Sequence, residues 1–201
     1  MVGTREERIT DMSHYFLAIR TEQDAISSIQ AQLLPYYAYR RVYRTDEFHL
    51  TLQFFGELDD EEVETVIETI EPITASTAPF TLALTQLDHF GNELRPRVLV
   101  MTPKSSVDLN HMAKQLRRAL TETLPRLDRK PFVPHVTLAK KWHEGERRAY
   151  VPPSFHIEVP VDELVLYQIQ PQRVPAYEAI HVFPLTRPKE DLWRSRLKFL
   201  T

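Results

Sequence analysis

FHLTLQFFGEL, residues 48–58, carries a histidine and a threonine two positions apart inside an otherwise apolar run. Alternate residues of a β-strand point to the same side, so His49 and Thr51 share one face of a predicted strand. Leu50 and Leu52 share the opposite face, which can enter a hydrophobic core. The polar face needs water, a partner or a ligand, because an unpaired buried polar group costs about 1–3 kcal/mol.

A second segment, FVPHVTLAKK at residues 132–141, repeats this pattern. His135 and Thr137 each follow their counterparts in the first segment by 86 positions. Val136 and Leu138 take the apolar face of the second strand. In both places a strand and a helix are expected before the histidine strand, so an internal duplication is the economical explanation. If the halves are related by a pseudo-two-fold axis, the two polar faces meet across one cleft.

The hydrophobic periodicity predicts a mixture of helices and strands. The duplicated units are expected at 14–20, 21–34 and 49–55, and again at 97–101, 106–123 and 135–139. Further strands are expected near 80–87, 155–159, 163–169 and 177–183. The basic stretch 39–47 is interpreted as a connection and the stretch 89–97 as a turn.

Helix start and stop signals are clearest after residue 58. Asp59 is a candidate N-cap with Glu62 three positions later, which is the spacing of a capping box. Apolar residues then follow helical spacing as far as Ile70, and Pro72 predicts the end of this helix. Thr21 is the corresponding candidate cap for the helix over 21–34.

Composition excludes several classes of protein. The 201 residues suit one compact domain or two small lobes, and the absence of cysteine excludes disulfides, thiolate zinc sites and cysteine nucleophiles. Four glycines are too few for a phosphate-binding glycine loop, so side chains must hold any phosphate. We find no apolar run long enough for a membrane span and no signal-peptide pattern, and we expect a cytoplasmic protein. With a net charge of −3, nucleic acid would be contacted locally.

Two histidines that face one substrate can perform acid–base chemistry. An imidazole titrates near pH 6.5, so one ring can accept a proton while the other donates one. Threonine hydroxyls can bind substrate oxygens without adding charge. A phosphodiester suits such a site, and no metal ion is required.

Two other interpretations are open at this point. A single His-x-Thr in a strand is more often structural than catalytic, and the functional reading therefore depends on the second copy. A metal site built on the same two histidines lacks a nearby carboxylate or a third histidine in the sequence pattern.

Together, HLTL and HVTL resemble the two HxTx signatures of the 2H phosphoesterase superfamily. Within it, the segments FHLTLQFFGEL and PFVPHVTLAK are most similar to RNA 2′,3′-cyclic 3′-phosphodiesterases, also known as LigT-like 2′-5′ RNA ligases. The resemblance implies an α+β fold of two lobes, each an antiparallel sheet with helices packed outside, around a central cleft. It covers residues 13–187 as one bilobal domain, with 1–12 as an N-terminal extension and 188–201 as a C-terminal tail.

The resemblance also implies roles for individual residues. His49 corresponds to the proton donor to the 3′-oxygen and His135 to the base that activates water. Thr51 and Thr137 correspond to phosphate-binding residues. Relatives usually carry an arginine soon after the second motif, where this chain has Lys140 and Lys141. An ammonium can still meet phosphate as a point charge but lacks the two-pronged contact of arginine, and we expect Lys140 to bind the phosphate.

The implied reaction opens a terminal RNA 2′,3′-cyclic phosphate to a 2′-phosphate. Reversal, with an RNA 5′-hydroxyl in place of water, would give 2′-5′ ligation. We expect no metal and no cofactor, RNA 3′ ends as the partner, no membrane association, and a monomer without an obligate protein partner. Two rivals remain: another 2H reaction, on 2′-5′ oligonucleotides or small cyclic nucleotides, and an RNA-end-binding module without turnover.

Overall fold

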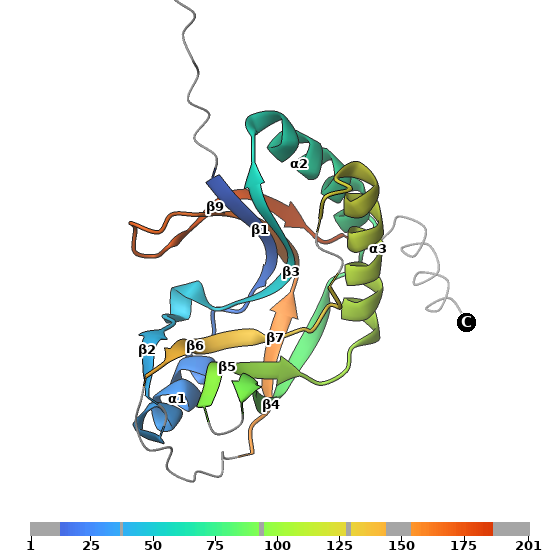
Figure 1. The fold of residues 1–201 in the computed structure, drawn as a ribbon. Helices are drawn as coiled ribbons and strands as arrows, with labels where there is room; N and C mark the ends of the chain where they lie inside the picture. The colour runs from blue at the N-terminus through green and yellow to red at the C-terminus, as the bar shows by residue number, and fades with distance from the viewer. Residues whose placement is uncertain (1–12, 37, 93–94, 128–129, 144–153, 187–201) are drawn as a thin grey trace, which may run out of the picture.

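The computed structural model describes residues 13–36, 38–92, 95–127, 130–143 and 154–186 (Figure 1). The first part of the chain forms β1 (Ser13–Arg20), α1 (Asp24–Leu33), η1 (Leu34–Tyr36), β2 (Tyr39–Val42), η2 (Thr45–Glu47), β3 (His49–Leu58), α2 (Asp60–Thr74) and β4 (Phe80–Asn92). The second part forms β5 (Arg95–Pro103), α3 (Val107–Thr123), β6 (Val136–Trp142), β7 (Ile157–Val161), β8 (Glu163–Ile169) and β9 (Tyr177–Pro184). The predicted extension 1–12 and tail 188–201 lie outside the described residues.

The strands form one curled antiparallel sheet with the order β7-β4-β5-β6-β3-β1-β8-β9, and β2 adds to β6 (Figure 1). The α+β fold expected from the sequence is confirmed. The two sheets expected as separate are joined at a single residue pair, Leu50 with Val136, between β3 and β6. Among the described residues β3 and β6 pair only at this point, so the two strands diverge beyond it.

The strand order supports the duplication. Outward from the junction, β3, β1, β8 and β9 form one half of the sheet, and β6, β5, β4 and β7 form the other. In each half the histidine strand is innermost and pairs with the strand that precedes it across a helix. Each histidine therefore lies at the start of one of the two central strands.

Two helix ends differ from the sequence prediction: the C-terminal end of α2 and the N-terminal end of α1. The capping box of Asp59 and Glu62 is present, but α2 continues through Pro72 to its end at Thr74, so the predicted stop is wrong. Proline removes only one N–H from the last turn, and the N–H of Ala75 still donates to Glu71 O. Thr21 does not cap α1, because the helix begins at Asp24 and its N-cap is Gln23, which makes no side-chain cap hydrogen bond. The N–H of Thr21 instead donates to Phe48 O (3.0 Å) and continues the β1–β3 ladder.

The strands also differ from the prediction. β2 forms within the stretch expected to be a connection, where Arg41 pairs with Lys140 of β6. β4 and β5 extend through the expected turn at 89–97 as a longer hairpin, with Gly91 in the left-handed region at φ 101°. Basic and glycine-containing sequence concealed these strands, since neither stretch shows apolar alternation.

The apolar faces of the motif strands pack largely as expected. Leu50, Val136 and Leu138 are fully buried in the core. Leu52 is only half-buried, because the register between β1 and β3 shifts there and Leu52 has no partner residue. α2 and α3 pack side by side, as Figure 1 shows. Among the described residues no helix is long and apolar enough to cross a membrane.

Candidate active site

The two motif histidines are held in the same way. Nδ1 of His49 lies 2.7 Å from the carbonyl oxygen of Glu47, and Nδ1 of His135 lies 2.7 Å from that of Val133. A carbonyl only accepts, so Nδ1 carries the hydrogen in both rings. This leaves Nε2 of each imidazole available to a substrate, and it fixes the direction in which each ring points.

The β3–β6 junction brings the two motifs together. Leu50 pairs with Val136 in an antiparallel register. Extending this register by one position on either side sets His49 against Thr137, and Thr51 against His135. Since residues on either side of a paired residue share the opposite face of the strand, all four polar side chains lie on one side of the sheet. The geometry therefore supports the single cleft predicted from the repeat.

Both threonine hydroxyls are open to a ligand. Thr51 and Thr137 are half-buried. Within the ranges that the structure describes, neither side chain makes a hydrogen bond. Each hydroxyl can donate one hydrogen bond, which suits the non-bridging oxygens of a phosphate group.

The ring of His49 is enclosed by aromatic side chains. Its centroid lies 4.8 Å from that of Phe16, 5.1 Å from that of Tyr177 and 6.4 Å from that of Tyr167. Burial in this setting is the main cause that lowers the pKa of His49 to about 4, and the neighbouring positive charge of Lys140 acts in the same direction. At neutral pH the ring is therefore uncharged in the free protein.

Lys140 is a cation that the site leaves available. Its Nζ lies 5.2 Å from the ring centroid of Tyr43. No carboxylate among the described side chains pairs with Lys140, whereas Arg41, its partner across the β2–β6 ladder, is bound to Glu47. The next residue, Lys141, is exposed and has a left-handed backbone with φ 63°. Lys140 rather than Lys141 is thus placed to meet an anion.

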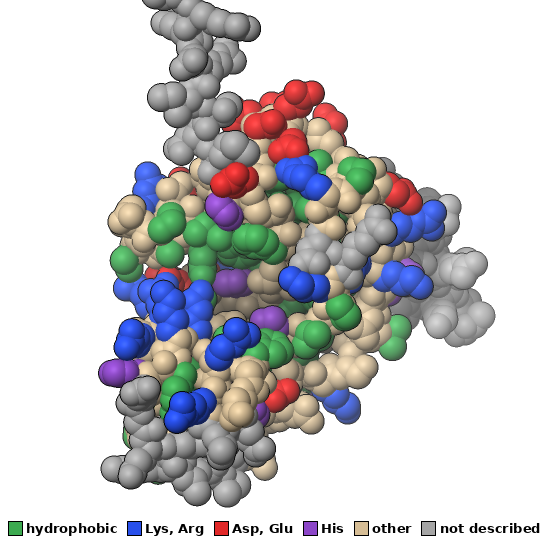
Figure 2. Space-filling view, in the orientation of Figure 1, with side chains coloured by type: hydrophobic (Ala, Val, Ile, Leu, Met, Phe, Trp, Pro, Cys, Tyr) green, Lys and Arg blue, Asp and Glu red, His purple; other side chains and the backbone are tan. Residues whose placement is uncertain are grey.

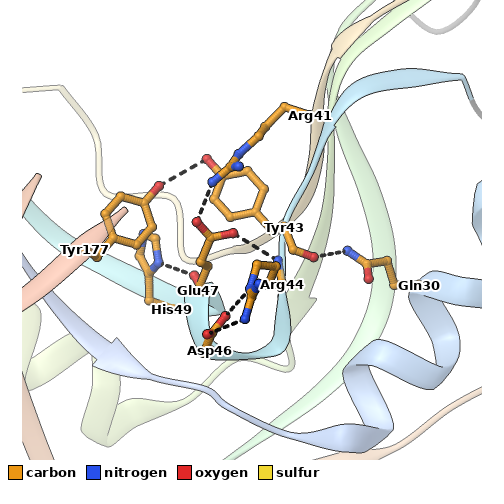
Figure 3. Close-up of polar contacts among 8 residues, drawn as sticks. All are labelled: Gln30, Arg41, Tyr43, Arg44, Asp46, Glu47, His49 and Tyr177. Atoms are coloured by element: carbon orange, nitrogen blue, oxygen red, sulfur yellow. Dashed lines mark hydrogen bonds and ion pairs between the residues drawn. The ribbon is translucent and has the colours of Figure 1, made fainter. Parts of the chain in front are cut away.

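A buried carboxylate supports the first histidine (Figure 3). The side chain of Glu47 is 1% exposed, pairs with Arg41 and accepts the N–H of Arg44 at 3.1 Å. The carbonyl of the same residue holds His49. This role could not be predicted from the sequence, because a single glutamate in a basic stretch carries no distinguishing pattern.

The wall behind His49 joins the two halves of the sheet. Tyr177 of β9 and Tyr43, which follows β2, approach each other with their hydroxyls 3.5 Å apart (Figure 3). The amide of Gln30 in α1 donates to the carbonyls of Tyr43 and Leu138, at 2.8 Å each, and so ties this segment to β6. The sequence offered no signal for the contacts from Gln30 to Leu138 and from Tyr177 to Tyr43, since each joins residues more than a hundred positions apart.

A pocket of about 250 Å³ opens beside the junction, on the side of His135. Its lining residues include Thr51 and His135, and α3 contributes Arg117. Its other walls include Phe54 and Phe132. Figure 2 shows histidines in the hollow between the two halves, with Lys and Arg side chains along its left rim. No group of three His, Cys, Asp or Glu side chains with metal-binding spacing occurs among the described residues.

The comparisons with known proteins agree with this geometry. The family model described as the 2′-5′ RNA ligase superfamily matches residues 19–173. The RNA 2′,3′-cyclic phosphodiesterase of Geobacillus stearothermophilus is 32% identical over 182 residues, covering 86% of this chain and 57% of that relative. The protein of the same name from Bacillus subtilis is 27% identical, over 86% of this chain and 97% of its own. The chain therefore spans little more than half of the first relative and nearly all of the second.

Solved structures show the same fold. Escherichia coli LigT complexed with 3′-AMP superposes with a TM-score of 0.74 at 27% identity, covering 88% of this chain and 100% of that one. A Thermus thermophilus protein superposes with a TM-score of 0.73 at 25% identity, covering 87% and 98%.

Proposed function

The chain belongs to the 2′-5′ RNA ligase superfamily, and from this premise we propose that it hydrolyses terminal 2′,3′-cyclic phosphates of RNA to 2′-phosphates without a metal ion. The observation that carries the proposal is the pair of imidazoles anchored through Nδ1 on either side of the β3–β6 junction. Relatives named RNA 2′,3′-cyclic phosphodiesterase support the choice of substrate.

In the proposed reaction His135 is the base and His49 the acid. Nε2 of His135 takes a proton from water, whose oxygen attacks phosphorus. The bond from phosphorus to the 3′-oxygen breaks, and protonated His49 gives its Nε2 proton to that oxygen. Thr51 and Thr137 donate to the non-bridging oxygens, and Lys140 offsets their negative charge. The products are a 2′-phosphate and a free 3′-hydroxyl.

The acid role requires His49 to gain a proton when substrate binds. Its pKa is about 4 in the free protein, lowered by burial and by neighbouring positive charge. A bound cyclic phosphate places a negative charge beside the imidazolium and thereby raises this pKa. Binding and proton uptake are then linked, so affinity for the anion should increase as pH falls toward 4.

We expect this linkage to be visible by NMR titration of the His49 ring. The free protein should titrate near pH 4, and Lys140→Ala should raise that value because it removes a repelling charge. Addition of a cyclic-phosphate oligonucleotide to the inactive His135→Gln variant should raise it by a unit or more relative to that variant alone. An unchanged pKa in the complex would contradict the acid role.

The proposed activity is tested with an oligoribonucleotide that ends in a 2′,3′-cyclic phosphate, incubated with and without EDTA. We expect a product heavier by one water, with its phosphate on the 2′-oxygen, at the same rate in both conditions. No turnover, or loss of turnover in EDTA, would overturn the proposal.

The same assay separates the two rivals. Faster turnover of 2′,3′-cyclic mononucleotides or of 2′-5′ dinucleotides would identify another 2H reaction. Binding of the cyclic end without any product would identify a binding module. We also propose that the enzyme is a monomer and that it is cytoplasmic. Size-exclusion chromatography with light scattering tests the monomeric state.

A further inference from the structure

Each motif strand carries a β-bulge directly after its threonine. In the ladder with β1 the pairing register skips Leu52, and in the ladder with β5 it skips Leu138. These two leucines are 86 positions apart, as are the motif histidines. At the second bulge the consecutive residues Leu138 and Ala139 are both fully buried. A bulge interrupts the alternation of side chains and aims the residues beyond it in a new direction.

The second bulge turns Lys140 toward the cleft. Lys140 lies three positions after Thr137, so strict alternation would place the two on opposite faces of the sheet. In the ladder with β5, however, Lys140 is paired with Val98. Thr137 is paired with Val100 in the same ladder. Val98 and Val100 are two positions apart on β5 and share a face, so their partners share that face as well.

The equivalent position in the first half carries an aromatic side chain. Phe54 lies 86 positions before Lys140 and pairs with Phe16, whose ring contacts His49. This position of the first half is therefore uncharged, and the charge is supplied from the second half. A single ammonium on a flexible stem serves the phosphate there, so what holds the stem matters for binding.

We propose that Tyr43 is a positioning residue that holds the ammonium of Lys140 ready for the phosphate. The inference rests on the proposed function, in which Lys140 meets the phosphate. Nζ of Lys140 lies 5.2 Å from the centroid of the Tyr43 ring, within the range of cation–π attraction. A lysine stem loses rotamer freedom when its ammonium is bound. Contact with the ring restricts the stem beforehand, so less freedom is lost when the phosphate arrives.

Tyr43 is itself fixed at the second bulge. Its side chain is buried, and its N–H donates to the carbonyl of Leu138 at 2.9 Å. The amide of Gln30 donates to this same carbonyl and to that of Tyr43 (Figure 3). The Tyr43 hydroxyl meets that of Tyr177. The bulge that turns Lys140 and the ring that receives it are therefore parts of one hydrogen-bonded unit.

The ring of Tyr43 attracts Lys140 without neutralising it. Arg41 approaches the same ring, with Cζ 5.3 Å from the centroid, but Arg41 is bound to the carboxylate of Glu47. In the part of the chain that the structure describes, Lys140 has no such carboxylate. An aromatic face offers a cation its quadrupole and no net charge. The full charge of Lys140 therefore remains for an anion in the cleft.

Titration of His49 in the free protein reports whether Tyr43 holds Lys140. Burial is the main cause of the low pKa of His49, and the charge of Lys140 lowers that pKa as well. Lys140→Ala should therefore raise the pKa, and Tyr43→Leu should raise it at least half as much, because the released ammonium moves into solvent. The double variant should titrate as Lys140→Ala does. Additive rises would show that Tyr43 acts on His49 by another route, and would overturn the inference.

Affinity for inorganic phosphate, followed by NMR shifts of the motif histidines, gives a second measurement. Lys140→Ala should weaken binding about tenfold, as for one lost hydrogen bond to a charged group. Tyr43→Leu should weaken it about three- to fivefold, but less than about twofold when Lys140 is already alanine. Tyr43→Phe keeps the ring and should restore the affinity. Equal affinities of Tyr43→Leu and the wild type would contradict the proposal, as would a Tyr43→Phe variant as weak as Tyr43→Leu.

Tyr39→Leu is the matched control. Tyr39 is an aromatic residue of the same edge strand and packs on Trp142, with ring centroids 5.4 Å apart. This substitution should change neither the His49 titration nor the phosphate affinity. If thermal melting shows that Tyr43→Leu does not fold, Tyr43→Met removes the ring and fills more of its space. If the wild type hydrolyses no cyclic phosphate, the proposed function fails, and the His49 titration still decides whether Tyr43 holds Lys140.

Discussion

His49→Ala and His135→Ala are each expected to lower kcat for cyclic-phosphate hydrolysis by about 10²–10⁴-fold, the usual contribution of a positioned acid or base. Each substitution removes the imidazole to which the proposed mechanism assigns the proton transfer on its side of the phosphorus. His111→Ala is the matched control, because His111 is an exposed histidine on α3, away from both motif strands. Initial rates at saturating oligonucleotide, with thermal melting to confirm folding, provide the measurement.

A substrate with a better leaving group separates the two roles. In a cyclic phosphate with sulfur at the 3′ position, the leaving thiolate needs little protonation. The deficit of His49→Ala should then shrink to about tenfold or less, while that of His135→Ala should persist, because the water must still be deprotonated. Relief of His135→Ala instead would exchange the assignments of acid and base.

The parts of the site that could be predicted from sequence were local. A histidine and a threonine at spacing two define a polar strand face, whatever the rest of the chain does. The second copy then placed that face in an equivalent strand. The two strands meet at the pair of Leu50 and Val136, because β3 and β6 are the innermost strands of the two halves and are neighbours in the sheet.

The remainder depends on contacts that are not local. Phe16, Tyr167 and Tyr177 surround His49 from β1, β8 and β9, and none of them carries a pattern that distinguishes it from a core aromatic residue. The half-exposed position of Leu52 follows from a shift in pairing register, which strict alternation cannot anticipate. β2 was missed because an edge strand of basic residues lacks the apolar alternation that marks a strand.

The carboxylate of Glu47 gives the second large expected effect. Glu47→Ala should lower the free energy of unfolding by about 2–3 kcal/mol, below the 3–5 kcal/mol typical of a broken buried pair, because Arg41 is 37% exposed and can regain water. For a chain of this size, that corresponds to a melting temperature lower by about 4–12 °C. The neighbouring pair of Arg44 and Asp46 is 58% and 39% exposed, so Asp46→Ala should cost less than about 1 kcal/mol.

Loss of Glu47 should also affect catalysis, because its turn carries the carbonyl that holds Nδ1 of His49. We expect kcat to fall by about tenfold in Glu47→Ala with little change in KM, since the substrate-binding threonines are untouched. Glu47→Gln keeps the size of the side chain and an acceptor for the N–H of Arg44 while removing the charge. Because the charge of Glu47 raises the pKa of His49, that pKa should fall further in both variants, whereas kcat should fall mainly in the alanine variant. A purely structural role would lower the melting temperature and leave the His49 titration where it is in the wild type.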